Sequence, residues 1–545
     1  MNGLMMEQPL LISSILDYAA DHHGRTEMVS CTADRPAHRT TYDELRRRVR
    51  KLANALSHRL GVRQGDRIAT LAWNDHRHFE LYYGISGMGA VCHTINPRLF
   101  PEQIAYIVNH ARDRFLFVDP MFLPLLERLE GSLRALERVV VLCDAECMPT
   151  PARGGLLCYE TLIGDEPEAF DWPMLDEASA SGLCYTSGTT GNPRGVLYSH
   201  RAIVLHSLGA LQPDAMGISS RDVVLPAVPM FHVNAWGLPY TCPMIGAKMV
   251  MPGPRLDGAS LLEQFERERV TFSAGVPTIW FNLLNHLKEN GRRPSTLRKV
   301  VIGGAAAPRS MIQTFEEDYG IEVVHAWGMT EMTPLGVVGT LKAGMSELPP
   351  EERYTIKEKQ GHAVWGVEIK IVDDEGRRLP HDGKASGLLY VRGPWVARAY
   401  FEDEQASRAA FDADGWFATG DVATIDVEGY VQLTDRAKDL IRSGGEWISS
   451  IDLENAAVAH PDLAEAAAIA IAHPKWGERP LLIAVRKPGA EVEKAEILAF
   501  LEEKVARFWL PEDVVFVEEL PHTATGKLQK SALRERFRDY RLPES

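Results

Sequence analysis

Short apolar runs alternate with helical patterns through most of the chain, and this alternation limits the possible folds more than any other feature. The runs at 67–73 and 299–304 are long enough for buried strands. The segments at 51–60 and 260–270 carry apolar residues three and four positions apart, as covering helices do. This order is typical of βα units with mainly parallel strands. We therefore predict an α/β fold.

The pattern changes from about residue 361, where apolar and polar residues alternate singly between turn-forming residues. That alternation favours an antiparallel, barrel-like β subdomain. The residues after Asp435 carry their own helix and strand patterns and read as a small α+β unit. We predict a large N-terminal domain over 1–436, made of βα subdomains and the β subdomain, and a small C-terminal domain over 437–545.

Length and charge narrow the class of protein. At roughly 100–200 residues per domain, 545 residues suggest three or four structural units. The net charge, 59 minus 74 or −15, disfavours a nucleic-acid binder, which would present a basic face. No run of 18 apolar residues occurs, so no membrane span is predicted. The amino terminus lacks a basic start and reads as an opening helix and not as a signal peptide.

The seven cysteines are scattered and odd in number. Cys143 and Cys147 have the spacing that can begin a zinc site, but no second Cys/His pair follows at finger spacing. Reduced, unpaired thiols are the favoured interpretation, and we expect a cytoplasmic location.

The strongest local signal is the segment 185–196, YTSGTTGNPRGV, directly after an apolar stretch at 181–184. Its glycines allow tight turns, its hydroxyls and amides can donate to phosphate oxygens, and Arg194 adds positive charge. A surface turn is the alternative, but it would not need a buried strand and a cation beside it. The Walker spacing is absent, which disfavours a P-loop ATPase. The residues expected to hold phosphates are Thr186, Ser187, Gly188, Thr189, Thr190, Gly191 and Arg194.

This segment resembles the phosphate loop of the adenylate-forming superfamily, which contains acyl-CoA synthetases, firefly-type luciferases and the adenylation domains of peptide synthetases. Further motifs match in the family's order over about 340 residues, so the resemblance covers nearly the whole chain. They are Gly303-Gly304-Ala305, Trp327-Gly328-Met329-Thr330-Glu331, Thr419-Gly420-Asp421, Asp435-Arg436-Ala437-Lys438-Asp439, Ser443-Gly444-Gly445-Glu446 and Thr525-Gly526-Lys527.

The resemblance implies roles at the nucleotide. Glu331 would hold Mg²⁺ through oxygen, which hard cations prefer, and Thr330 would donate to the α-phosphate. Asp421 would accept from the two ribose hydroxyls, and Arg436 would contact the nucleotide. Without the family context, a solvated acid, a turn aspartate and a surface ion pair would be the simpler interpretations. Trp327 and Gly328 would complete the ATP site.

The resemblance also implies a mobile C-terminal domain. Lys527 would bridge the carboxylate and the phosphate in the adenylation transition state. Lys438 would be the hinge about which the domain turns between two half-reactions. For either lysine, an ordinary surface charge is the alternative. A loop of Gly444, Gly445, Glu446 and Trp447 would then line the approach of CoA.

Three stretches, 93–100, 231–237 and 445–450, resemble bacterial medium-chain fatty acid–CoA ligases and, equally, ligases for 3-methylmercaptopropionate. His232 and Trp236 would sit at the acyl pocket, although core packing is the alternative for the tryptophan. An apolar pocket discriminates one methylene by only about 1–3 kcal/mol, so chain length stays open. The other residues expected there are Gly303, Ala305, Met329 and Pro334.

Two departures from the family are Arg194 and Arg442, where lysine is usual. Both keep the charge, but arginine forks differently. The resemblance as a whole implies an AMP-forming acyl-CoA synthetase for a short- to medium-chain fatty acid that uses ATP, Mg²⁺ and CoA, and it is also the sole basis for expecting a homodimer. A 3-methylmercaptopropionyl-CoA ligase, transfer to another acceptor, and a non-catalytic homologue are the alternatives. The last would be expected to lose Lys527, Glu331 or Asp421, and all three are present.

Overall fold

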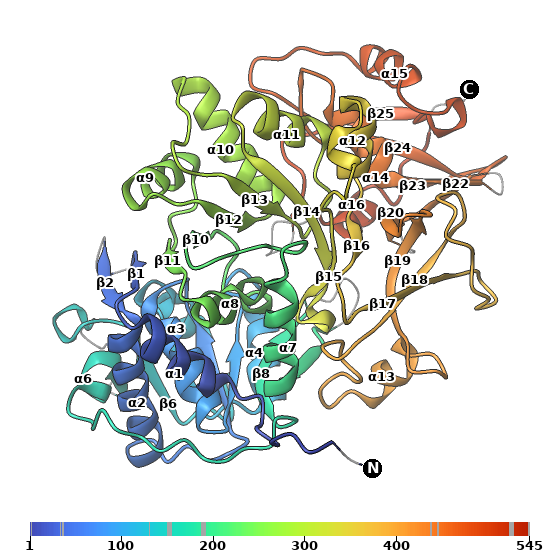
Figure 1. Ribbon diagram of the computed structural model, residues 1–545. Helices are drawn as coiled ribbons and strands as arrows, with labels where there is room; N and C mark the ends of the chain where they lie inside the picture. The colour runs from blue at the N-terminus through green and yellow to red at the C-terminus, as the bar shows by residue number, and fades with distance from the viewer. Residues whose placement is uncertain are drawn as a thin grey trace.

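A computed structural model gives the fold (Figure 1). The structure describes residues 1, 3–32, 34, 37–129, 131–149, 155–186, 192–436, 439–443, 446–522 and 528–542, and for residues 436, 442, 446 and 447 it describes the backbone alone.

The predicted βα units form first a seven-stranded sheet in the described part of the chain. All neighbouring strands pair in parallel except the last two, which form an antiparallel hairpin. The strand order is β7 (Leu156–Cys158), β6 (Arg138–Val141), β5 (Phe115–Val118), β3 (Arg67–Leu71), β4 (Val91–Thr94), β8 (Ala180–Tyr185) and β9 (Gly195–Ser199).

The second sheet has thirteen described strands and changes character in the middle. Its strands are β17 (Glu368–Val372), β18 (Ser386–Arg392), β19 (Phe417–Ile425), β20 (Tyr430–Arg436), β16 (Gly361–Ala363), β15 (Leu335–Val338), β14 (Glu322–Gly328), β13 (Lys299–Ile302), β12 (Phe272–Gly275), β10 (Val223–Pro226), β11 (Lys248–Met251), β1 (Glu27–Ser30) and β2 (His38–Thr41). Pairing is parallel from β14 to β1 and antiparallel from β14 to β17. The antiparallel part, predicted from the change near residue 361, therefore continues the parallel part through β14.

Helices cover both sheets. Every residue of α3 is buried, because this helix contacts β1 of one sheet and β4 and β8 of the other. The helices of this part are α1 (Ile12–His23), α2 (Tyr42–His58), α3 (His76–Gly87), α4 (Pro101–Ala111), α5 (Leu123–Arg128), α6 (Tyr159–Gly164), α7 (His200–Ala210), α8 (Leu238–Ile245), α9 (Gly258–Glu268), α10 (Pro277–Asn290), α11 (Arg309–Gln313), α12 (Pro350–Lys357) and α13 (Glu404–Ala410).

Helix α2 illustrates why these sequences form these elements. Its first residues carry a capping box, in which Thr41 and Glu44 bond to each other's backbone N–H groups. Leu45, Val49 and Leu52 then lie on one buried face at helical spacing. None of the helices in the described ranges is long and apolar enough to cross a membrane.

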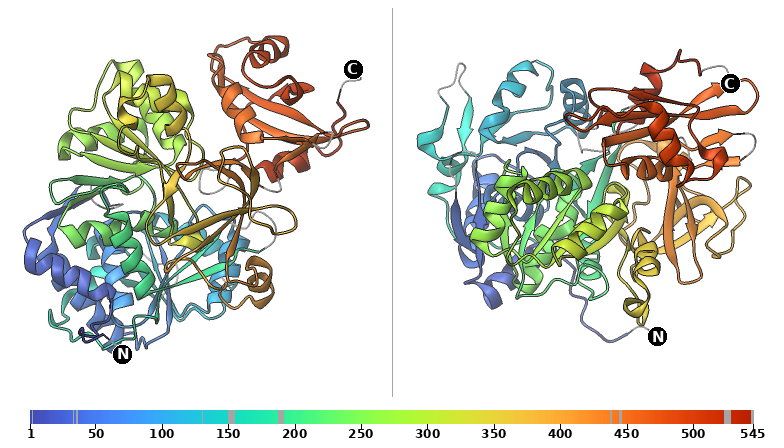
Figure 2. Two further views of the ribbon diagram at one scale, coloured as in Figure 1. Left: turned by 45° about the vertical axis from the view of Figure 1, so that its right-hand side comes forward. Right: turned by 90° about the horizontal axis from the view of Figure 1, so that it is seen from above.

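The chain ends in a separate lobe beside the large sheet (Figure 2). Its strands are β22 (Glu446–Ile448), β21 (Ile441–Ser443), β24 (Gly477–Arg486), β23 (Leu463–His473) and β25 (Asp513–Phe516), and its helices are α14 (Ser450–Val458), α15 (Lys494–Glu502) and α16 (Lys530–Arg536). Leu453, Ile497 and Leu501 pack on one face of this sheet, and Leu533 packs on the other with Ile469. The predicted α+β unit with its own core is confirmed.

Candidate active site

The predicted phosphate loop connects β8 to β9. Tyr185 pairs with Gly195 in the hairpin, and the Thr186 N–H donates to the Arg194 carbonyl oxygen at 2.9 Å. A Cβ at Gly195 would lie 3.1 Å from Phe401 and from Tyr185, so the hairpin packs closely at this point. The middle of the predicted loop, Ser187, Gly188, Thr189, Thr190 and Gly191, lies outside the described residues.

Glu331 lies in a short 3-10 turn, η5 (Thr330–Met332), that follows β14. The Tyr198 hydroxyl donates to the Thr330 carbonyl oxygen at 2.7 Å, and the Ala397 N–H donates to that of Glu331 at 2.7 Å. The Tyr400 hydroxyl donates to Glu331 Oε1 at 2.8 Å. Glu331 is only 6% exposed, so it is not the solvated acid that the sequence left as an alternative.

Tyr400 connects this turn to the phosphate loop. The Arg194 guanidinium lies over the Tyr400 ring, 5.2 Å from its centroid, which is the geometry of a cation–π contact. Burial, together with the charge of Glu331, raises the pKa of Tyr400, so the phenol stays protonated and able to donate. Neither Tyr400 nor Tyr198 is marked by the sequence. Each is remote in sequence from the residue that it holds, and neither has a local pattern that marks it.

Asp421, on β19, is hydrogen-bonded to Trp327 near the end of β14. The Trp327 Nε1–H donates to Asp421 Oδ2 at 3.1 Å, and Asp421 is 2% exposed. Asp421 pairs with Arg436 across β19 and β20, so the backbone brings together two residues that were predicted to contact the nucleotide. Gly328 permits the tight turn beside them, because a Cβ there would lie 1.9 Å from the Pro334 carbonyl oxygen.

The predicted acyl motif forms an unusual turn before α8. Residues 233–236 all have positive φ, between 38° and 57°, a conformation that non-glycine residues rarely adopt. Trp236 is 8% exposed, and a Cβ at Gly303 would come within 3.2 Å of its indole. Backbone strain of this kind is concentrated at functional sites. Trp236 and Gly303, two residues predicted for the acyl pocket, therefore pack directly against each other.

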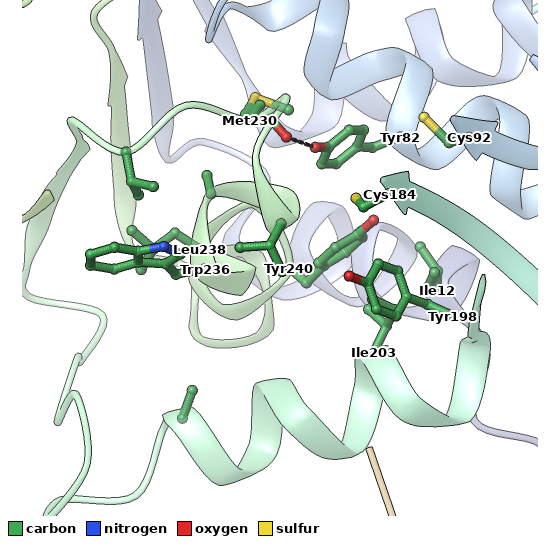
Figure 3. Close-up of a cluster of buried hydrophobic side chains, with 14 of the residues drawn as sticks. Ile12, Tyr82, Cys92, Cys184, Tyr198, Ile203, Met230, Trp236, Leu238 and Tyr240 are labelled. Atoms are coloured by element: carbon green, nitrogen blue, oxygen red, sulfur yellow. Dashed lines mark hydrogen bonds between the residues drawn. The ribbon is translucent and has the colours of Figure 1, made fainter. Parts of the chain in front are cut away.

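The side chains around this turn form an apolar cluster (Figure 3). Tyr240, at the start of α8, packs towards Tyr82, Cys184 and Tyr198, whereas Trp236 points to the other side of the helix (Figure 3). The Cys184 thiol lies 3.8 Å from the Asn234 side-chain oxygen. Burial raises the pKa of Cys184 to about 11, so this thiol, next to the phosphate loop, is neutral and is no nucleophile.

The remaining predicted pocket residues come from three segments: Met329 and Pro334 from the turn at 328–334, His232 from the residue before the positive-φ turn, and Ala305 from the loop after β13. The Met329 N–H donates to the Pro334 carbonyl oxygen at 3.0 Å. His232 is half-buried, and Ala305 is exposed in the loop after β13. Met329 packs against the buried cluster that contains Trp236.

The C-terminal site residues are described only in part. Arg436 ends β20, and Glu446 and Trp447 begin β22, paired with β21. Lys438, Gly444, Gly445 and Lys527 lie outside the described residues. Their predicted roles stay predictions.

Comparisons with known proteins agree with this geometry. The model of the AMP-binding enzyme family matches residues 16–401, and that of the AMP-binding enzyme C-terminal domain matches 452–527. The chain is 52% identical to a 3-methylmercaptopropionyl-CoA ligase of Ruegeria lacuscaerulensis over 99% of both chains. It is 49% identical to a medium-chain-fatty-acid–CoA ligase of Ectopseudomonas oleovorans over 100% of this chain and 99% of the relative.

Solved structures share the fold over the whole length. An anthranilate CoA ligase in complex with anthranoyl-AMP superposes with a TM-score of 0.86 at 27% identity, covering 98% of both chains. ATP-bound MatB from Rhodopseudomonas palustris superposes with a TM-score of 0.83 at 26% identity, covering 98% of this chain and 99% of the other. The chain therefore belongs to the AMP-binding enzyme family, within the adenylate-forming superfamily.

Proposed function

We propose that this chain is an AMP-forming acyl-CoA ligase that activates a short- to medium-chain carboxylic acid. The observation that carries the proposal is one continuous set of contacts. It runs from Asp421 through Trp327 to the turn with Glu331, and from there through Tyr400 to Arg194. Groups suited to bind ribose, metal and phosphate are thus joined on one side of the proposed nucleotide site.

The reaction has two steps. A carboxylate oxygen attacks the α-phosphorus of ATP, the bond to the β-phosphate breaks, and pyrophosphate leaves. The CoA sulfur then attacks the carbonyl carbon of the acyl-adenylate, AMP leaves, and the thiol proton goes to solvent. Both reactants of the first step are anions, so the site must neutralise charge and align the attack.

The proposed site residues divide this work. Asp421 holds the ribose hydroxyls while Trp327 fixes its carboxylate, and Thr330 donates to the α-phosphate. The hairpin ends at Thr186 and Arg194 orient the outer phosphates. Arg436, Lys527 and the glycine-rich middle of the phosphate loop supply the remaining positive and N–H groups, and Lys527 acts at the moment of attack.

Mg²⁺ is part of the proposal, and the residues fit it. Glu331 is a buried carboxylate whose Oε1 accepts from Tyr400, so the side chain is held in one orientation. One or two carboxylates together with substrate phosphates are the usual ligands of Mg²⁺. When bound, the ion neutralises phosphate charge. Glu331 would hold it beside Thr330.

The C-terminal domain, over 437–545, is proposed to turn about Lys438 after adenylation. The loop Gly444, Gly445, Glu446 and Trp447 then lines the path of CoA. We also propose a cytoplasmic homodimer, which size-exclusion chromatography with light scattering and cell fractionation would test.

The proposed acid has an apolar chain of short to medium length. Trp236 packs against Gly303, and in this proposal the two residues bound an apolar slot that His232, Ala305, Met329 and Pro334 complete. The relatives named above act on 3-methylmercaptopropionate and on medium-chain fatty acids by their names, so both acids are candidates. An apolar slot separates them by only about 1–3 kcal/mol per methylene.

A panel of acids tests the proposal. Pyrophosphate release and CoA-thiol consumption are measured with Mg-ATP and acetate, butyrate, 3-methylmercaptopropionate, octanoate, palmitate or cinnamate. We expect both signals, strongest between butyrate and octanoate, with 3-methylmercaptopropionate in that range. Pyrophosphate release without thiol loss would show transfer to another acceptor and contradict the ligase assignment.

A further inference from the structure

A buried lysine in the C-terminal domain has no part in the chemistry described so far. Lys530 is 9% exposed, its Nζ lies 2.7 Å from Glu454 Oε1, and it also donates to the Ser450 hydroxyl. The Ala468 N–H donates to the same Glu454 oxygen at 2.7 Å. A buried ammonium is costly unless it is paired and hydrogen-bonded, and Lys530 is both. This arrangement fixes the start of α16 on α14.

Lys530 stands at the base of the segment that carries Lys527. The described residues on both sides of that segment are joined, since His522 bridges to Leu528 and the Gln529 N–H donates to the Pro521 carbonyl oxygen at 2.7 Å. Lys530 follows Lys527 by three residues, which span at most about 10 Å of chain. The anchor at Lys530 therefore limits where Lys527 can reach.

The same network continues to the nucleotide side. The Ser450 N–H donates to Asp435 Oδ2 at 2.7 Å, and the Ser449 hydroxyl donates to the Thr434 carbonyl oxygen. Asp435 lies on β20 and pairs with Val422, the residue after Asp421. An unbroken set of polar contacts thus links the base of the Lys527 segment to the strands of the nucleoside site.

We propose that Lys530 is a positioning residue for adenylation. Lys530 is held by Glu454 and Ser450, so it fixes residues 528–530, which follow segment 523–527, to α14. Helix α14 in turn docks on Asp435. The inference rests on the proposed function of Lys527. A displacement of about 1 Å in a reacting group can cost about 100-fold in rate, so loosening this anchor slows the adenylation step. The second step, which does not use Lys527, is spared.

The test measures the two half-reactions of the full-length enzyme separately. For Lys530→Met, we expect the kcat of acid-dependent pyrophosphate release to fall about 10- to 100-fold. The KM for ATP and the rate of thioester formation from supplied octanoyl-adenylate stay within about twofold of wild type, since neither depends on the anchor. Lys530→Arg, which keeps the charge, recovers most of the loss.

Two further variants separate positioning from folding. Lys530→Met leaves Glu454 buried without its cation, so the double variant Lys530→Met/Glu454→Gln should regain thermal stability but not adenylation. Lys494→Met is the matched control, because it removes a different ion pair of the same domain, to Asp513 at 3.0 Å, and should leave both steps unchanged.

Equal loss of both half-reactions in the double variant, or full adenylation by Lys530→Met, would overturn the proposal. Lys527→Ala, measured in parallel, distinguishes the two levels of the argument. If that variant retains adenylation, the proposed function of Lys527 fails. If it loses adenylation while Lys530→Met does not, only the positioning role fails.

Discussion

The two parts of the candidate site are attached in different ways. On the N-terminal side, Asp421 and Glu331 are buried within strands and turns of one continuous sheet, and each is held by a side chain from another segment. On the C-terminal side, the small lobe docks on Asp435 and Thr434 through the first residues of α14. On the proposed mechanism, Asp421 and Glu331 act from this buried scaffold, whereas Lys527 belongs to the domain that is proposed to turn.

Among the buried residues on the N-terminal side, removing the charge of Glu331 should reduce activity most. Glu331→Gln keeps the shape but weakens the proposed metal ligand, and we expect pyrophosphate release to fall about 10²- to 10³-fold. The affinity for ATP, measured by calorimetry, should also no longer depend on Mg²⁺. Unchanged Mg²⁺ dependence in that titration would remove Glu331 from the metal site.

Asp421→Asn should weaken nucleotide binding more than chemistry. Losing a charged acceptor of a hydrogen bond costs about 1.5–3 kcal/mol, or roughly 10- to 100-fold in the KM for ATP. The effect should shrink with 3′-deoxy-ATP, which lacks one of the proposed partners. An equal effect on ATP and its deoxy analogue would mean that Asp421 does not contact the ribose.

Tyr400→Phe should have a smaller effect on the same side of the proposed nucleotide site. It removes one neutral-to-charged hydrogen bond to Glu331 but keeps the ring under Arg194, so a loss of about 3- to 10-fold in kcat is expected. Tyr319→Phe, at a partly exposed tyrosine near Arg293, is the control and should leave kcat unchanged. Full activity in Tyr400→Phe would show that Glu331 needs no such support.

Buried histidines make the large domain sensitive to acid. Burial lowers the pKa of His206 to about 3 and that of His325 to about 4. Below pH 6.5 these histidines bind protons in the unfolded chain but not in the folded protein. Their contribution to the free energy of unfolding is therefore fully present above pH 6.5 and is lost as the pH falls towards the folded-state pKa values.

The lobe contains a group of the opposite kind. Burial raises the pKa of Asp452 to about 6, so its unfavourable contribution grows as the pH rises from about 4 to 6. Each buried histidine should lower the free energy of unfolding, measured by urea titration, by up to about 1.4 kcal/mol per pH unit as the pH falls from 6.5 to 5. His206→Gln should flatten this slope, and Asp452→Asn should steepen it. An unchanged slope in His206→Gln would contradict the burial argument.

The sequence predicted the parts that depend on local pattern. Short apolar runs located β3 and β13, helical spacing located parts of α2 and α9, and the single alternation from about residue 361 marked antiparallel strands. Glu331 and Asp421 could be singled out from the sequence because they lie within motifs. Tyr400 and Tyr198 could not be, since their roles depend on pairings 69 and 132 residues distant in the chain. The positive-φ turn at 233–236 was also missed, because its residues are not glycines and tertiary packing holds them.

The most direct test of the contrast between the two sides is the pair of half-reactions in Lys527→Ala. Acid-dependent pyrophosphate release and the conversion of supplied octanoyl-adenylate to octanoyl-CoA are measured on the same preparation. The account predicts that the first rate falls at least about 100-fold while the second stays within about twofold. Equal losses in both rates would contradict it, because the C-terminal lysine would then serve the whole reaction and not one step.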